Sequence, residues 1–218
     1  MTSPAKQYIS FIASEWADPI ADLAIAWRRR LERKTGTRDL SPYDRGMSCA
    51  IVLQLVVMLE SHTLRAQWNV NPPERGGRQW TVTDYWQKST YLEREAVLDA
   101  IVLRDVVAHN HLYWFDEPQQ RSAESEYAYG GDTKFRARVV QGRLRHTGML
   151  CIPGTLGPAE VCKVAGIVER ALQWLAAVHS NIDADFHFAR RGKDKTLWQV
   201  LRSTLEVACA HDSNIDGR

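Results

Sequence analysis

The stretch MSCAIVLQLVVML, residues 47–59, is the most apolar part of this 218-residue chain. Apolar side chains occupy nearly every position after residue 50, so a helix formed here has no polar face and must be buried on all sides. Gln54 interrupts the run, which is also shorter than the roughly 20 residues that span a bilayer. We therefore expect a central core helix, capped by Asp44 and continuing to about Trp68, on which the other elements pack.

Four more stretches have apolar residues at the spacing of an amphipathic helix. They cover about residues 8–34, 91–113, 158–175 and 196–210. Pro19 is expected to break or kink the first, because proline removes a helical hydrogen bond, and Pro158 starts the third. The pattern predicts a mainly α protein, an up-and-down helical bundle, with residues 1–218 forming one domain around one core.

The segment from about 117 to 150 differs from the helices around it. Charged and apolar residues alternate between Lys134 and His146, which is the period of a β-strand, and Gln141-Gly142 would turn two strands into a hairpin. We expect a short β-hairpin inserted in the bundle, with four arginines on one face: Arg136, Arg138, Arg143 and Arg145. Such a face could follow the phosphates of a nucleic acid, or its charges could keep an exposed hairpin soluble.

Composition narrows the class of protein. The formal net charge of +2 is far below that of a histone-like DNA-binding protein. The four cysteines form no Cys-x-x-Cys pair and mostly have apolar neighbours, so we expect reduced thiols in the core. No apolar signal core with a small-residue cleavage site follows the N-terminus. These features predict a soluble cytoplasmic protein that does not span a membrane.

A second stretch, LRDVVAHNH at residues 103–111, places ionisable groups late in the expected helix of residues 91–113. Burial of the Arg104 guanidinium is costly unless an anion from the protein or a ligand meets it, and arginine does not escape by losing its proton. His109 is the side-chain type that holds and releases a proton near neutral pH, and Asp105 lies one helical turn before it. The stretch therefore combines a cation that needs an anion with a natural acid or base.

Arg104 and His109 are separated by four residues, and the polar Asp105 directly follows the arginine. This arrangement, near the end of a long apolar helix, resembles the Arg-x4-His signature of the HEPN superfamily of helical ribonucleases and RNA-binding proteins. Many members carry asparagine where this chain has Asp105. The resemblance covers a few residues of one helix together with the all-helical pattern, and it implies a HEPN-like bundle.

The resemblance further implies metal-independent cleavage of RNA, in which the ribose 2′-hydroxyl attacks the adjacent phosphate. His109 would act as general acid or base, Arg104 would stabilise charge on the phosphate oxygens, and Asp105 would orient either of them. Substrate contacts are expected from the hairpin arginines and from three residues after the motif: Asn110, His111 and Trp114. His111 is a second candidate for the acid or base, and the Trp114 ring could stack on a base. No cofactor or metal is expected, since no third metal ligand has a recognisable spacing.

Helix geometry adds a condition to this site. Five positions along a straight helix place Arg104 and His109 about 140° apart around its axis. Either the helix unwinds near Ala108, or two such segments face one another across a two-fold axis. The resemblance favours the second arrangement, a homodimer with a composite site. It also implies a toxin or defence effector that is controlled by an antitoxin or another regulatory protein.

Two other interpretations stay open. In the first, the chain is a binding module of the same fold, which holds RNA, a nucleotide or a protein partner and cuts nothing. In the second, Arg104 pairs with a core carboxylate, and His109 and His111 lie in the last helical turns, where cationic side chains suit the helix dipole.

An alternating order of helices also predicts what lies at each end of the bundle. The first helix would run parallel to the motif helix, so the basic residues among 28–34 would share an end with His109 and form a positive rim, or simply a solvated helix end. Glu60-Ser61-His62 would lie at the opposite end from His109. Residues 69–79, rich in proline and glycine, predict a loop or lid, and the basic residues among 190–195 are expected in a surface loop.

Overall fold

The computed structural model describes residues 15–33, 40–70, 81–109, 112–114, 127–129, 137–180, 182, 184–190 and 193–212. Most of this part of the chain is helical: α2 (Ala17–Arg33), α3 (Pro42–Val70), α4 (Val82–Lys88), α5 (Arg94–His109), α6 (Pro158–Val178) and α7 (Leu197–Asp212). A short 3₁₀ helix, η2 (Pro153–Thr155), precedes α6. The mainly α class predicted from the sequence is therefore confirmed.

Within these ranges the strands form three short antiparallel pairs. They are β1 (Leu112–Trp114) with β2 (Tyr127–Tyr129), β3 (Val139–Val140) with β4 (Arg143–Leu144), and β5 (His187–Arg190) with β6 (Lys193–Thr196). The β3–β4 pair is the predicted hairpin. Its turn residues Gln141 and Gly142 have φ values of 51° and 70°, as the first and second positions of a type I′ turn require.

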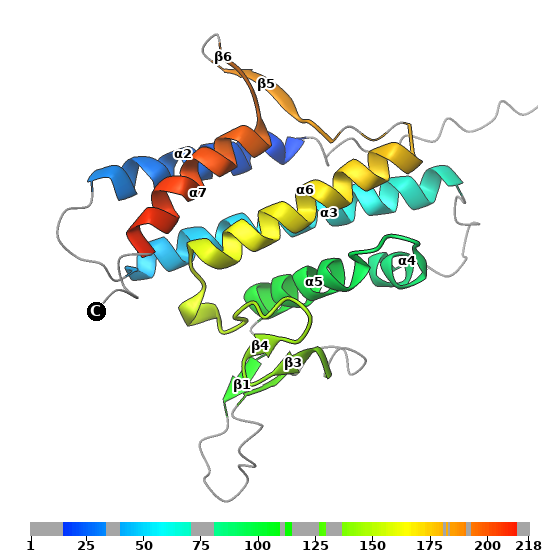
Figure 1. Ribbon diagram of the computed structural model, residues 1–218, viewed down its shortest axis with the longest axis horizontal. Helices are drawn as coiled ribbons and strands as arrows, with labels where there is room; N and C mark the ends of the chain where they lie inside the picture. The colour runs from blue at the N-terminus through cyan, green and yellow to red at the C-terminus, as the bar shows by residue number, and fades with distance from the viewer. Residues whose placement is uncertain are drawn as a thin grey trace, which may run out of the picture.

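Figure 1 shows the helices in three layers. α2 and α7 lie side by side in one layer, α3 and α6 form the middle layer, and α5 lies on the other side of that middle layer, preceded by α4. The long helices alternate in direction, with α3 and α6 running opposite to α2, α5 and α7. The described helices thus have the predicted up-and-down order.

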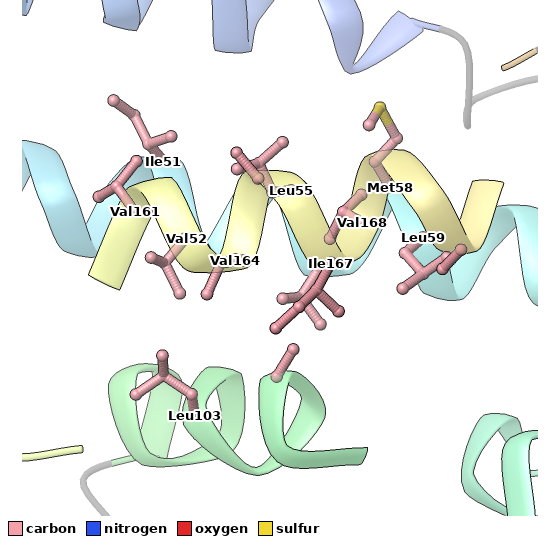
Figure 2. Packing of buried hydrophobic residues seen from close by; sticks show 14 of the residues in the cluster. Ile51, Val52, Leu55, Met58, Leu59, Leu103, Val161, Val164, Ile167 and Val168 are labelled. Atoms are coloured by element: carbon pink, nitrogen blue, oxygen red, sulfur yellow. The ribbon is translucent and has the colours of Figure 1, made fainter. Parts of the chain in front are cut away.

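The core that positions α5 lies where α3, α5 and α6 meet (Figure 2). The middle of α3 contributes a set of fully buried side chains: Ile51, Val52, Leu55, Met58 and Leu59. Val164 and Val168 of α6 and Leu103 of α5, which are also fully buried, lie beside them. Burying one such aliphatic side chain contributes about 1.5–3 kcal/mol, so these contacts hold α5 firmly against the middle layer.

α3 is longer than the apolar run of residues 47–59 from which it was predicted. Its segment Pro42–Gln67 is long and apolar enough to cross a membrane by length and composition. In the folded protein, 56% of the most apolar 18-residue part of this segment is buried inside the bundle. Burial against α2, α5 and α6 therefore accounts for its apolar character.

The cap of α3 differs from the prediction. The hydroxyl of Ser41 accepts a hydrogen bond from the Asp44 amide at 3.2 Å, and the Asp44 carboxylate accepts one from the Ser41 amide at 3.1 Å. Ser41 is the cap residue, and Asp44 is the acidic residue that completes a reciprocal capping box in the first turn.

Trp16 lies in a turn between the helical Glu15 and the start of α2 at Ala17, so the first helical stretch is interrupted just before Pro19, as predicted. Pro19 lies in the first turn of α2, where its missing N–H removes no helical hydrogen bond. The end of α5 differs from the prediction. α5 ends at His109, and residues 112–114 form β1 instead of continuing a helix to residue 113. The sequence Leu-Tyr-Trp favours a strand, and Tyr127–Tyr129 supplies its backbone partners.

Several elements were not predicted, among them α4 and the β5–β6 pair. α4 starts after Thr81, whose hydroxyl accepts a hydrogen bond from the Asp84 amide at 3.1 Å. The basic residues 190–195, expected in a loop, lie partly in β5 and β6, where Arg190 is paired with Lys193. Their polar sequence has no apolar alternation that would reveal a strand. Residues 69 and 70 of the predicted loop or lid belong to α3, and residues 71–79 lie outside the described residues.

Candidate functional site

Arg104 lies on α5 and contacts two carboxylates. Its Nη2 donates a hydrogen bond to Glu60 Oε1 on α3, and its Nη1 pairs with Asp105 Oδ1 at 2.5 Å. All three side chains are largely buried, with 21% of Arg104, 16% of Glu60 and 22% of Asp105 exposed. The anion that a desolvated arginine needs is therefore supplied by the protein itself.

Sequence reasoning missed Glu60, and its predicted place at the opposite end of the bundle is wrong. α5 has 16 residues and α3 has 29, so α5 lies along only part of α3 and Arg104 reaches the level of Glu60. The neighbouring His62 is buried, with its Nδ1 2.9 Å from the carbonyl oxygen of Met58. It lies inside the core, with its ring against that of Phe186.

The proton affinity of Glu60 is altered by this setting. Burial raises the pKa of Glu60 above its ordinary value of 4.5, and the charge of Asp105 raises it slightly further. The charge and hydrogen bond of Arg104 oppose this rise. Glu60 is thus a carboxyl group that takes up a proton more readily than an exposed glutamate, and the loss of its contact with Arg104 would strengthen that tendency.

His109 is the last residue of α5, and its side chain is exposed. α5 remains helical through Ala108, so the unwinding proposed for that position does not occur. Arg104 and His109 therefore keep the separation of about 140° expected for a regular helix, with Arg104 directed at Glu60 on α3. Within one chain, the two side chains therefore leave α5 in different directions.

Several predicted substrate contacts cannot be placed against this pair. Asn110, His111 and Arg136 lie outside the described residues. Trp114 belongs to β1, but its side chain lies outside the described part of the structure. Their roles stay predictions.

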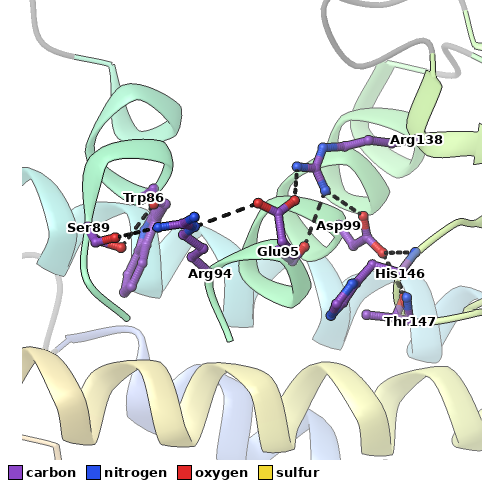
Figure 3. Close-up of polar contacts among 8 residues, drawn as sticks. All are labelled: Trp86, Ser89, Arg94, Glu95, Asp99, Arg138, His146 and Thr147. Atoms are coloured by element: carbon purple, nitrogen blue, oxygen red, sulfur yellow. Dashed lines mark hydrogen bonds and ion pairs between the residues drawn. The ribbon is translucent and has the colours of Figure 1, made fainter. Parts of the chain in front are cut away.

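Arg138 has a structural position that the hairpin pattern did not indicate (Figure 3). Its Nη1 donates to Asp99 Oδ1 at 3.0 Å and to the carbonyl oxygen of Glu95, and its Nη2 donates to the Glu95 carboxylate. Only 18% of its side chain is exposed. The prediction that Arg138 shares an open basic face with the other hairpin arginines is therefore wrong, because its guanidinium is directed at carboxylates of α5.

Asp99 is fully buried and also binds the residues that follow β4. Its Oδ2 accepts hydrogen bonds from the amides of His146 and Thr147, at 3.1 Å and 2.9 Å, and from the Thr147 hydroxyl at 3.1 Å. Asp99 and Arg138 together attach the β3–β4 region to α5. An aspartate between Leu98 and Ala100 in a buried helix was the sequence signal for this anchor.

Arg143 and Arg145 are the exposed arginines of the described hairpin. Arg143 donates a hydrogen bond to the carbonyl oxygen of Gly148 at 3.0 Å, which fixes its position beside the turn. The half-exposed Val140 lies across from Arg143 in the β3–β4 register. A basic surface remains here, but it is smaller than the four-arginine face predicted.

The basic end of α2 does not form a continuous rim with His109. α2 and α5 end on the same side of the bundle, but they lie on opposite sides of the layer formed by α3 and α6 (Figure 1). Arg28 pairs with Glu32 at 2.7 Å, and Arg30 contacts Asp44 at 3.4 Å. The guanidinium of Arg30 also lies over the Tyr43 ring, 4.4 Å from its centroid. Lys34 lies outside the described residues.

In the described part of the chain, no group of three or more His, Cys, Asp or Glu side chains is placed to hold a metal ion. Cys49, Cys151 and Cys162 carry thiols that take part in no disulfide. Burial raises the pKa of the Cys151 thiol to about 12, so this thiol stays protonated and unreactive at neutral pH.

No protein-family model, curated protein or solved structure matches this chain. The contacts described above define the candidate site: Arg104, Asp105 and His109 on α5 and Glu60 on α3. The packing of α5 on the middle layer places these residues.

Proposed function

We propose that this protein is a metal-independent endoribonuclease with a site built around Arg104 and His109. The ribose 2′-hydroxyl loses its proton to a base and attacks the adjacent phosphorus. The bond to the 5′-oxygen breaks, and that oxygen takes a proton from an acid. His109 serves one of these two proton transfers, and Arg104 stabilises the charge that develops on the phosphate oxygens. The products carry 2′,3′-cyclic phosphate and 5′-hydroxyl ends.

The observation that carries this proposal is the placement of Arg104 and His109 in the last turns of one helix. Arg104 is largely desolvated, and a guanidinium in such a setting interacts more strongly with phosphate charge than one in bulk water. His109 is exposed, so it is accessible to a polymeric substrate. Asp105 lies one turn before His109, in position to orient it.

We further propose a homodimer with a composite site. Arg104 and His109 diverge around α5, so one phosphate meets both only when the two groups come from different copies of the chain. Such an enzyme acts on cytoplasmic RNA and needs restraint, which we assign to an antitoxin or regulatory protein.

The contact between Arg104 and Glu60 favours a second function, that of an RNA-binding module without catalysis. The same contact would serve as a structural ion pair that joins α5 to α3, with Arg104 holding no reacting phosphate. In that case His109 carries out no proton transfer. Arg143 and Arg145 would then hold RNA backbone on the hairpin.

The two functions are separated by incubating a mixed single-stranded RNA with wild type, His109→Ala and His146→Ala in EDTA. His146 is a matched control, because it is another exposed histidine and only its backbone amide bonds to Asp99 in the described contacts. Fragment lengths and end groups are then determined. Cyclic phosphate ends from wild type and His146→Ala, but not from His109→Ala, support the nuclease. RNA bound and left intact by all three supports the binding module.

A further inference from the structure

The contacts of Arg104 restrict how a phosphate reaches it. Nη2 is bonded to Glu60 and Nη1 to Asp105, whereas Nε is buried and has no hydrogen-bond partner among the described residues. Each terminal nitrogen of the guanidinium thus already uses one of its two N–H donors for a carboxylate. A phosphate at Arg104 therefore competes with these carboxylates for the terminal nitrogens, because the buried Nε is inaccessible.

The charges of this cluster make the replacement conditional. One guanidinium faces two carboxylates, so the three side chains carry a net charge of one negative unit when all are ionised. An RNA phosphate brings another negative charge to the same place. Like charges at contact distance repel strongly in a partly desolvated site, so binding is favourable when one carboxyl group becomes neutral.

Glu60 is the carboxyl group suited to this change. Asp105 directly follows Arg104 on the same helix, whereas Glu60 belongs to α3 and can separate from the guanidinium without unwinding α5. The charged groups that act on Glu60 among the described residues are Arg104 and Asp105, both from α5. Burial and the charge of Asp105 favour the protonated form of Glu60, and Arg104 is the group that opposes it.

We propose that Glu60 is a positioning residue for the phosphate-binding group Arg104. It holds Arg104 against α3 while no RNA is bound. A phosphate of RNA then takes its place on the guanidinium, and Glu60 takes up one proton from solvent. No covalent bond other than this O–H bond changes. The inference rests on the proposed function, since it takes RNA as the ligand of Arg104.

The test compares RNA binding by His109→Ala with binding by His109→Ala/Glu60→Gln. Loss of His109 prevents cleavage of the bound RNA and removes an imidazole whose titration would contribute to the pH profile. The probe is a fluorescent single-stranded RNA oligonucleotide, and its anisotropy is measured at constant ionic strength from roughly pH 5 to pH 8. Thermal melting confirms that each variant is folded.

A matched control is Glu169→Gln in the same His109→Ala background. Glu169 also joins two helices through an arginine, Arg202 Nη2 at 2.6 Å, and 20% of its side chain is exposed. This variant therefore removes the same charge from a glutamate of similar burial, but between α6 and α7 and away from Arg104. It should keep the pH profile of His109→Ala.

For His109→Ala, the affinity for RNA should fall as the pH rises above the ordinary glutamate value of 4.5. With Glu60→Gln added, the profile should become flat, and binding at the high end of the range should be about fivefold tighter. Titration calorimetry of His109→Ala in two buffers of different ionisation enthalpy should show uptake of a proton. This measurement needs no substitution at Glu60.

The failures are distinguishable. If the two proteins bind RNA with the same pH profile, or if calorimetry finds no proton uptake, the role of Glu60 is wrong while RNA binding stands. If neither protein binds RNA at any pH, the proposed function itself is contradicted, and the role of Glu60 falls with it.

Discussion

At the scale of single residues, Arg104 has both a structural and a proposed chemical task. Its pair with Glu60 joins α3 to α5, and the same guanidinium is the proposed phosphate ligand. Removing one partner of a desolvated ion pair leaves the other without compensation, which costs more than the pair itself contributes. Substitutions here must therefore be judged by both stability and activity.

Arg104→Ala should lower the free energy of unfolding by about 1–3 kcal/mol, because Glu60 and Asp105 then lie beside one another without a cation. Urea denaturation measures the change. Arg202→Ala is the control, since Arg202 is 63% exposed and its pair with Glu169 should contribute less than about 1 kcal/mol. Equal losses for the two variants would show that Arg104 is not part of a buried pair.

The pH dependence of stability tests the setting of Glu60. Because burial raises its pKa in the folded protein above 4.5, ionising Glu60 is less favourable there than in the unfolded chain. This penalty is absent below pH 4.5 and complete above the folded-state pKa. Glu60→Gln should therefore gain stability relative to wild type as the pH rises through that interval. A difference in melting temperature that is constant with pH would contradict the raised pKa.

At the scale of elements, the β3–β4 hairpin depends on a buried carboxylate of α5. Asp99 accepts hydrogen bonds from His146, Thr147 and Arg138 at one point, so the hairpin and the site share the same supporting helix.

Asp99→Ala should lower the free energy of unfolding by about 3 kcal/mol, because it leaves two backbone amides and the Arg138 guanidinium without their acceptor. Hydrogen exchange at the His146 and Thr147 amides should become much faster. Glu93→Ala is a control near the start of α5, where an exposed pair with Arg170 is lost instead. Unchanged exchange at both amides in Asp99→Ala would contradict the anchor.

The elements show which features could be predicted from local sequence. The apolar pattern of α3 and the start of α6 at Pro158 could be predicted, since burial dictates them directly. The turn at Gln141-Gly142 was also predicted, because it needs residues that accept positive φ. The end of α5 could not be predicted, since residues 112–114 become a strand only through pairing with Tyr127–Tyr129.

Only part of the candidate site could be predicted from the sequence, because the rest depends on contacts between distant segments. Arg104, Asp105 and His109 belong to one local motif, whereas Glu60 is 44 positions away from Arg104 and meets it only through helix packing. For Arg138, a local pattern predicted an exposed position that contacts with a distant segment overturn. It followed the alternation of an exposed hairpin face, but the buried Asp99 and the nearby Glu95 draw it onto α5.

At the scale of the whole molecule, the three-layer arrangement decides what surrounds the site. α5 lies in an outer layer, while the arginines of α2 lie beyond α3 and α6 (Figure 1). Those arginines therefore do not belong to the surface around His109. The composite site that we propose needs two copies of this chain, with Arg104 from one and His109 from the other.

Mixing Arg104→Ala with His109→Ala tests this claim most directly. Each variant alone should leave RNA intact in EDTA. After exchange of subunits, half of the dimers should pair the two variants, and each of these has one complete site. The mixture should therefore recover about a quarter of the wild-type rate and yield cyclic phosphate ends. A mixture as inactive as its components, when wild type cleaves under the same conditions and subunit exchange is verified, would contradict the composite site.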